Sequence, residues 1–392
     1  MIKLLRKEDC TGCYACQDIC PTRAIGMQPD FEGFAYPHID RAKCIDCHLC
    51  EKTCPVINAG SLTETNAGTP EVYAAYTADD AIRMESSSGG VFSVLAGRML
   101  ERNGHVAGAV WDEGFNVEHR ITNKAAEAEA FRGSKYVQSD ASGLFAEVKR
   151  LLNAGEQVLV SGTPCQMAAL RAFLGKPYEN LLIVDFVCNS VNSPKVFRAY
   201  LDDLESEANS RIIKYSQRNK QVEGWKQFAV VADFEDGRQY VRIRKADDFI
   251  YCFLGTHISS RPSCADCRYK QLPRVADITI ADFWGIEKTD PEMYSSKGTS
   301  LVLLNNEKGK AYFSEVAEKL VIKNEPLKAA VDNNTALIRN PVWPKVKRDK
   351  FYKALADKGF RYAMQKYSHP VPSLKERVWI FGSRVKHALL RR

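Results

Sequence analysis

The feature that most constrains how this chain can fold is a cysteine pattern that occurs twice near its N-terminus. Each copy has the spacing C-x2-C-x2-C-x3-C and is followed by a proline. The two copies contain Cys10, Cys13, Cys16 and Cys20, then Cys44, Cys47, Cys50 and Cys54. Thiols two residues apart are poorly placed to form disulfides with each other, and nothing at the N-terminus resembles a secretory signal. The repeated spacing therefore indicates metal ligands rather than a disulfide framework.

This spacing is typical of bacterial ferredoxins, in which three neighbouring thiolates bind three corners of a [4Fe–4S] cluster and the fourth ligand comes from the other copy. It predicts an α+β dicluster ferredoxin domain over residues 1–58, with short strands at 24–26 and 56–57 after the two copies. The predicted ligands are Cys10, Cys13, Cys16 and Cys54 for one cluster and Cys44, Cys47, Cys50 and Cys20 for the other. Zinc sites and structural thiols are the alternatives, but zinc sites rarely repeat such a run twice.

The rest of the chain has an ordinary globular composition, and its length of 392 residues allows two or three domains. Its longest apolar run, at 181–188, is far shorter than the roughly 20 residues of a membrane span. We therefore expect a cytoplasmic protein. The net charge is +7, but residues 373–392 hold six Lys or Arg against one Glu, so they carry +5 of it. The nearly neutral remainder gives no indication of nucleic-acid binding.

Predicted strands and helices alternate after residue 70, which is typical of a parallel sheet covered by helices. Helices are expected over 90–103 and 165–174, and apolar strands over 156–160 and 181–187 flank the second helix. A β-hairpin is expected over 228–243. The predicted divisions are a linker at 59–70, an α/β domain with a mostly parallel sheet and a β-hairpin insertion in two parts at 71–150 and 151–310, and a helical basic region at 311–392.

Four of the remaining five cysteines, Cys165, Cys188, Cys264 and Cys267, are placed to form a further set. Cys165 and Cys188 each follow a predicted parallel strand, so both are expected at the carboxyl edge of the sheet, where open α/β folds bind ligands. Cys264 and Cys267 form a C-x2-C pair in turn-like sequence. A third [4Fe–4S] cluster fits these four thiols, although a zinc site or unrelated buried thiols fit as well. The fifth, Cys252, lies in an apolar run and is expected in the core.

Several short motifs follow one another in the order seen in one known family. They are SGGV at 88–91, SKYV at 134–137, GTPCQ at 162–166, DFVC at 185–188, SPKVF at 193–197, RPSC at 261–264, RVADITI at 274–280 and DFWG at 282–285. Residues 1–310 thus resemble the coenzyme F420 hydrogenase/dehydrogenase β-subunit family, here with an N-terminal dicluster ferredoxin domain. The resemblance implies that 71–150 and 151–310 are the N-terminal-like and C-terminal-like regions of such a subunit. It also implies a flavoprotein that binds FAD beside a [4Fe–4S] cluster and exchanges a hydride with coenzyme F420.

The resemblance further suggests where FAD binds. The predicted cofactor-binding residues are Ser87, Ser88, Gly89, Gly90, Lys135, Tyr136 and Thr163. The serines and glycines precede a predicted helix, whose free N–H groups could bind a pyrophosphate, although an ordinary helix cap explains them equally well without the resemblance. Lys135 and Tyr136 could supply a cation and a stacking ring, or be a solvated lysine beside a core tyrosine. The sequence contains neither a G-x-G-x-x-G fingerprint nor a P-loop.

Together these features predict an oxidoreductase that passes electrons between a one-electron redox partner protein and a small-molecule two-electron substrate, through the clusters and FAD. Coenzyme F420 is one candidate substrate. The alternatives are a non-enzymatic electron-transfer subunit without flavin, and a reductase of polysaccharide or cell-envelope synthesis. No catalytic residue is predicted. His257 and Asp282 are candidates for proton delivery, but structural roles are the commoner explanation for such residues.

The C-terminal segment carries a separate pattern. Val378, Phe381, Val385 and Leu389 recur at helical spacing among basic residues. The pattern predicts a basic amphipathic helix that could contact an anionic membrane surface weakly or dock an acidic partner. A terminal helix packed on its own domain is the alternative.

Overall fold

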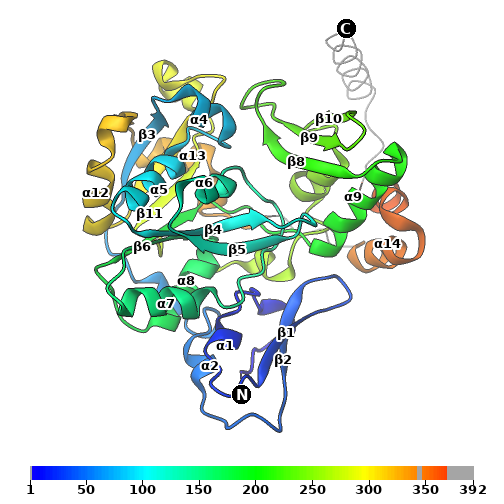
Figure 1. Cartoon of the computed structure of the whole chain (residues 1–392), viewed down its shortest axis with the longest axis horizontal. Helices are drawn as coiled ribbons and strands as arrows, with labels where there is room; N and C mark the ends of the chain where they lie inside the picture. Colours follow the sequence, from blue (N-terminus) through cyan, green and yellow to red (C-terminus); the bar gives the residue numbers. More distant parts are fainter. Residues whose placement is uncertain (1, 342–346, 369–392) are drawn as a thin grey trace.

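The computed structural model describes residues 2–341 and 347–368. Within them, a small N-terminal domain lies against a large sheet, and a three-stranded sheet lies beside the large one (Figure 1). No helix in these residues is both long and apolar enough to cross a membrane.

The N-terminal domain combines one hairpin with two short helices. Strands β1 (Ile25–Pro29) and β2 (Ala35–Ile39) pair antiparallel, with Ile25 opposite Ile39. Helices α1 (Ala15–Asp18) and α2 (Leu49–Lys52) each lie within one of the two cysteine runs. This ferredoxin-like α+β arrangement is the one that the cysteine pattern predicts.

The structure differs from expectation at two places after the second cysteine run. Residues 56–57 form a turn instead of a strand, because Asn58 Nδ2 donates a hydrogen bond to the carbonyl oxygen of Cys54 (2.9 Å) and folds the chain back. The expected linker begins with helix α3 (Ala59–Thr63), whose Leu62 is buried. This part of the segment therefore packs against the rest of the protein.

The large sheet contains eight strands within the described residues, in the order β13-β3-β12-β11-β7-β6-β4-β5. Its central strands β11, β7, β6 and β4 run parallel, and the pairs on either side are antiparallel. The strands are β3 (Glu71–Thr77), β4 (His105–Trp111), β5 (Val117–Thr122), β6 (Val158–Gly162), β7 (Leu181–Phe186), β11 (Ile278–Asp282), β12 (Ser300–Leu304) and β13 (Leu320–Asn324). The parallel centre agrees with expectation, and the antiparallel flanks make the sheet mixed.

Helices cover both faces of the large sheet (Figure 1). Helices α7 (Leu144–Asn153) and α8 (Pro164–Leu174) cover one face, and α5 (Val91–Glu101) and α12 (Glu307–Ser314) cover the other. Strand β6 is therefore apolar in both directions: Val158 and Val160 pack with α7 and α8, while Leu159 packs with α5. Burial on both faces explains why the sequence shows continuous apolar strands here instead of alternation.

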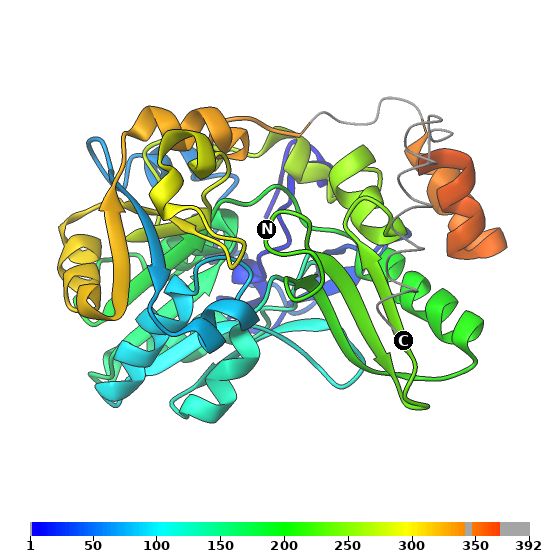
Figure 2. The same cartoon turned by 90° about the horizontal axis from the view of Figure 1, so that it is seen from above.

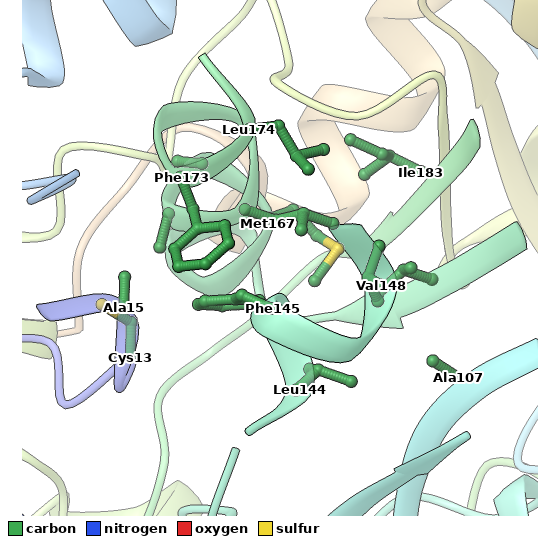
Figure 3. Close-up of a cluster of buried hydrophobic side chains, with 14 of the residues drawn as sticks. Cys13, Ala15, Ala107, Leu144, Phe145, Val148, Met167, Phe173, Leu174 and Ile183 are labelled. Atoms are coloured by element: carbon green, nitrogen blue, oxygen red, sulfur yellow. The ribbon is translucent and has the colours of Figure 1, made fainter. Parts of the chain in front are cut away.

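The N-terminal domain shares the core beneath α7 and α8. Cys13, Tyr14 and Ala15 belong to the same buried cluster as Phe145 and Met167. Figure 3 shows Cys13 and Ala15 beside the helices that carry these core residues. The two units are thus joined by side-chain packing as well as by the chain.

The three-stranded sheet is built from β8 (Ile212–Asn219), β9 (Ala229–Phe234) and β10 (Gln239–Ile243), all antiparallel. Strands β9 and β10 form the expected hairpin. Helices α9 (Pro194–Ala208) and α14 (Arg348–Ala363) pack on this sheet, and Figure 2 shows them on the same side of the molecule, away from the large sheet. Their shared core is rich in aromatic rings, among them Phe197, Tyr200, Tyr215 and Phe249.

The remaining helices include α4 (Asp80–Glu85), α6 (Ala125–Ala128), α10 (Asp248–Ile250), α11 (Ile286–Thr289) and α13 (Leu327–Asn333). The C-terminal region, expected to be helical, also supplies β13, which pairs with β3 at the edge of the large sheet. The apolar register of β13 is too short to stand out in the sequence, since Leu320 is its one buried residue. The predicted basic helix over 373–392 lies outside the described residues.

A buried carboxylate, Asp247, provides a test of the smaller core. It accepts hydrogen bonds from the hydroxyls of Tyr200 (2.7 Å) and Tyr240 (3.0 Å) and from the N–H of Ile250 (2.8 Å). Burial raises the pKa of Asp247 to about 6. The folded state therefore holds this proton more tightly than the unfolded state does, and the contribution of Asp247 to stability falls as pH rises from about 4 to about 6.

We expect Asp247→Asn to remove that part of the pH dependence. The wild type should lose on the order of 2–3 kcal/mol of unfolding free energy relative to the variant between about pH 4 and pH 7. Denaturant unfolding of both proteins at several pH values measures the difference, with Asp236→Asn, an exposed aspartate near the same hairpin, as the matched control. Parallel pH profiles for wild type and Asp247→Asn would contradict the prediction.

Candidate redox centres and cofactor site

The structure gathers Cys10, Cys13, Cys16 and Cys54, which we call the inner set. Three of them are buried and Cys10 is half-buried. Burial is the main cause that raises the pKa of Cys16, and the charges of the Cys13, Cys10 and Cys54 thiolates raise it further. Charges act this way only on near neighbours. The thiols predicted to bind the first cluster therefore lie together, although Cys54 comes from the second cysteine run.

Cys20, Cys44, Cys47 and Cys50, the outer set, lie nearer the surface. Cys50 is buried in a small core against which Cys20 packs, whereas Cys44 is half-buried and Cys47 is exposed. The N–H of Ala24 donates to Cys20 Sγ (3.2 Å). Burial raises the pKa of Cys20, but hydrogen bonds from Thr22 and this amide outweigh it and lower the pKa. An amide that donates to a thiolate also tunes an iron–sulfur centre.

Cys165, Cys188, Cys264 and Cys267, the sheet-edge set, meet at the carboxyl ends of the parallel strands. Gly162 at the end of β6 lies opposite Asp185 near the end of β7, so the cysteines that follow these strands share one edge of the sheet. Burial raises the pKa of Cys165, and the thiolates of Cys267, Cys188 and Cys264 raise it further. The four cysteines of the predicted third site are therefore neighbours.

Cys252 lies apart from these sets, fully buried in the core of the smaller sheet as its apolar surroundings predict. Across residues 2–341 and 347–368, no three His, Cys, Asp or Glu side chains are close enough together to hold a single metal ion. The four thiolates of a [4Fe–4S] cluster bind four different irons and so stand farther apart than the ligands of one ion. Neighbouring but separate thiols are the donors that such a cluster needs.

The loop at 86–90 precedes α5 and contains the serines and glycines of the predicted cofactor site. Both the N–H and the hydroxyl of Ser134 donate to Ser87 Oγ (2.8 and 2.9 Å). A Cβ on Gly89 would lie 2.4 Å from a carbonyl oxygen of β3, so a side chain at this position would clash with backbone. Gly90 adopts φ +83°, which favours glycine at the start of the helix.

Arg218, near the end of β8, ties this loop to the large sheet. Its guanidinium forms a bidentate pair with Asp282 (2.8 and 3.0 Å) and also donates to the Ser87 carbonyl oxygen (2.8 Å) and the Tyr136 hydroxyl (3.0 Å). Burial lowers the pKa of Arg218, but Asp282 and Tyr136 outweigh it and raise the pKa above its usual value. Trp225 Nε1 donates to the same carboxylate (2.5 Å).

Lys220, two residues farther along the chain, binds the backbone of the same loop. Its buried ammonium donates to the carbonyl oxygens of Ser88 (2.7 Å), Lys297 (2.5 Å) and Arg83. Burial lowers the pKa of Lys220 to about 7, and the neighbouring guanidinium of Arg218 contributes to the lowering. Three carbonyl acceptors match the three N–H donors of an ammonium group.

This region has more positive charge and more donors than its own acceptors satisfy. Arg218 lies beside Lys220 and Arg244. Burial and the charge of Arg218 lower the pKa of Lys220 and of Arg244, and Asp282 is the one carboxylate that acts against this lowering in both. Arg218 Nε is buried without a partner within the described residues, whereas the amide of Gln217 faces the Tyr215 hydroxyl and the guanidinium of Arg83 lies against the Tyr76 ring. A guanidinium with an unpaired N–H suits an anion with several acceptor oxygens, so this region fits a pyrophosphate-bearing cofactor such as FAD.

Gln217, Arg218 and Lys220 were not among the residues predicted from the sequence. A run of long polar residues at the end of a strand was the one local indication of them, and in the structure two consecutive members of that run are buried. Their partners at 83–88 and 282 are distant in the sequence, and the pairing appears only in the folded chain.

Arg218, Lys220, Arg244 and Asp282 form what we call the Arg218 cluster. Two of the predicted cofactor-binding residues lie apart from it. Lys135 Nζ donates to the carbonyl oxygens of Ala130 (2.7 Å) and Arg132 (3.0 Å), and burial lowers the pKa of Lys135 to about 7. Thr163 caps α8 and its hydroxyl lies 3.2 Å from Cys165 Sγ. Thr163 is therefore placed beside the sheet-edge set.

Neither residue considered for proton delivery is free to act as an acid. Both oxygens of Asp282 accept hydrogen bonds from Arg218, and one of them also accepts from Trp225. His257 is half-buried against Phe253, and burial lowers its pKa to about 4, so it is neutral at physiological pH. These contacts favour positioning roles for both.

The solved structures that are similar to this chain include a chain of the F420-reducing [NiFe] hydrogenase complex from Methanosarcina barkeri. The identity is 19%, the alignment covers 74% of this chain and 93% of that one, and the TM-score is 0.46. The comparison with curated proteins found no match.

Three family models match the sequence. A 4Fe-4S dicluster domain matches residues 9–58, which contain the inner and outer sets. The N-terminal region of the coenzyme F420 hydrogenase/dehydrogenase beta subunit matches residues 72–145, and its C-terminal region matches 155–330. The two beta-subunit matches include the 86–90 loop, Arg218, Lys220 and the sheet-edge set. This chain therefore belongs to the coenzyme F420 hydrogenase/dehydrogenase beta-subunit family and carries an N-terminal 4Fe-4S dicluster domain.

Proposed function

We propose that this protein is an iron–sulfur flavoprotein oxidoreductase with three [4Fe–4S] clusters and one FAD. The inner, outer and sheet-edge sets would each hold a cluster, and the Arg218 cluster with the 86–90 loop would hold FAD. When bound, FAD supplies the exchange between one-electron and two-electron chemistry that clusters alone lack. A one-electron protein partner and a small-molecule two-electron substrate complete the reaction.

The observation that carries the proposal is a single extended segment that contacts the cofactor loop, the chain after Cys188 and the first loop of the inner set. Residues 134–138 donate at one end to Ser87 in the cofactor loop (2.8 Å). In the middle, a carbonyl oxygen of this segment accepts from Asn192 (2.7 Å), four residues after Cys188. At the other end, a side-chain amide donates to the carbonyl oxygen of Gly12, between two cysteines of the inner set (3.1 Å). Centres bound at these places would be near one another.

The chain's own side chains would bind FAD by donating to it. Arg218 is held by Asp282 and Tyr136 with its Nε unpaired. The guanidinium of Arg244 lies over the Phe228 ring. Burial lowers the pKa of Arg244, and the nearby charge of Arg218 lowers it further. Arginine at such positions binds phosphate oxygens and stays protonated over the whole physiological range.

The substrate proposal follows from the family. Its name refers to coenzyme F420, a two-electron carrier, and we propose a hydride carrier of this class as the substrate. The outer set, with Cys47 exposed, is the part of the N-terminal domain most open to a protein donor or acceptor of single electrons.

The composition of the purified protein tests this function. After anaerobic purification we expect about twelve iron atoms, about twelve acid-labile sulfides and about one FAD per chain, because three four-iron clusters require that number. Cys165→Ser should lower the iron content to about eight, whereas Cys252→Ser, which changes a core cysteine outside the sets, should leave it unchanged. A wild-type content of about eight irons and no flavin would contradict the proposal and indicate an electron carrier with two clusters.

Lys220→Met tests the cofactor loop. Methionine cannot donate to the three carbonyl oxygens, so the 86–90 loop should lose its fixed shape and bind FAD about 10- to 100-fold more weakly, as expected for hydrogen bonds from a charged donor. Fluorescence titration of FAD into the deflavinated full chain measures the affinity. Lys328→Met, which removes an exposed lysine paired with Asp332, is the control. Equal affinities in the two variants would exclude this role for Lys220.

A further inference from the structure

The segment that carries Cys264 and Cys267 is anchored to the N-terminal domain on both sides of the cysteine pair. Arg261 lies three residues before Cys264, and Tyr269 lies two residues after Cys267. Each donates a hydrogen bond to a backbone carbonyl oxygen in the inner set's own loops. The two anchors are independent, since one holds the start of the first cysteine run and the other holds the end of the second.

Arg261 makes the first anchor. Its side chain is fully buried and donates to the carbonyl oxygens of Cys10 (2.7 Å) and Ala35 (3.0 Å) and to Gln138 Oε1 (2.6 Å). Its guanidinium also lies 4.4 Å from the centre of the Tyr36 ring. One arginine from the large domain therefore fixes a ligand cysteine and the hairpin strand β2 at once.

Gly12 leaves the space that the Arg261 side chain occupies. Gly12 has φ +65°, and a Cβ at that position would lie 2.7 Å from Arg261 Nη1 and 2.1 Å from Gln138 Nε2. A side chain at residue 12 would displace the side chains of Gln138 and Arg261 from these positions. The close approach at Gly12 therefore belongs to the same contact as the hydrogen bond to Cys10.

Tyr269 makes the second anchor. Its ring is 4% exposed, and its hydroxyl donates to the carbonyl oxygen of Pro55, the residue after Cys54 (2.5 Å). It belongs to the buried cluster that includes Cys13, and Cys165 and Cys267 pack against that cluster. The ring of Tyr269 is therefore packed in the same core as thiols of both sets.

We infer that Arg261 and Tyr269 are positioning residues that set the distance between the inner set and the sheet-edge set. The inference rests on the proposed function, because the distance matters for electron transfer only if both sets hold clusters. Neither residue exchanges an electron or a proton. Tyr269 keeps its hydroxyl proton as a hydrogen-bond donor, and its ring packs in the core that thiols of both sets share. The rate of electron transfer falls steeply with distance, so this contact sets the rate between clusters bound by the two sets.

The same contacts assign an order to the three sets. Both anchors reach residues of the inner set or their immediate neighbours, whereas Cys47 of the outer set is exposed. The sheet-edge set is thus connected to the inner set directly, and to the outer set only through the inner set.

Tyr269→Phe tests the inference with a minimal change, because it removes the hydroxyl and leaves the ring. The measurement is the electron paramagnetic resonance spectrum of the fully reduced holoprotein, in which neighbouring reduced clusters broaden and split each other's signals. We expect the variant to retain about twelve irons and to lose or weaken the interaction of the sheet-edge cluster with the inner cluster. The interaction between the two N-terminal clusters should persist as an internal reference. Tyr178→Phe, which removes the exposed hydroxyl bonded to Asn153, is the matched control.

Arg261→Lys provides a second variant that keeps the positive charge but cannot make three bonds in fork geometry. It should weaken the same interaction, and combined with Tyr269→Phe it should abolish it. Wild-type spectra in both variants would overturn the inference, as would loss of iron from the inner set, which would give these residues a role in holding the cluster rather than in placing it. About eight irons in the wild type itself would instead refute the proposed function.

Discussion

Burial of cysteine thiols between two domains is the constraint on which the rest of this structure depends. Burial raises the pKa of Cys13 to about 12 and that of Cys264 to about 11. Thiols with such values are protonated at neutral pH unless a bound cation stabilises the thiolate, and iron does so when it binds. For the inner set, cluster binding and domain packing are therefore coupled, because Cys13 lies in the core that joins the domains.

This coupling explains why the N-terminal domain is not a tethered module. A ferredoxin domain that only collected electrons could be connected by a flexible linker, yet here Leu62 of the connecting segment is buried in the shared core. Asn66 of the same segment donates to the carbonyl oxygens of Arg274 and Ala276 (both 2.8 Å). Leu62 and Asn66 thus attach the segment to the larger domain, while Ser61, Glu64 and Thr65 between and beside them are exposed.

The parts of the site that could be predicted from the sequence are those whose signal is local. The spacing of the cysteine runs specifies the inner set, and the continuous apolar strands β6 and β7 specify a parallel centre with Cys165 and Cys188 at one edge. Arg218 and Lys220 could not be found in this way. Each owes its place to partners more than sixty residues away in the sequence, and a polar strand end usually indicates solvent exposure. Strand β13 was missed for a related reason, since four of its five residues are exposed.

The Arg218 cluster differs from an ordinary buried ion pair in its balance of charge. Arg274, just before β11, pairs with Asp185 of β7 (2.8 Å), both fully buried, with one cation matched to one anion, although Arg274 Nε is also without a partner in the described residues. Around the 86–90 loop, Arg218, Lys220 and Arg244 instead share Asp282. Burying a cation without an anion costs several kcal/mol, and a fold retains such a cost where a ligand compensates it. Lys220 avoids the cost through three carbonyl oxygens, which fixes the loop, whereas Arg218 Nε has no such acceptor. The difference separates the residue that shapes the loop from the residue that remains available to an anionic ligand.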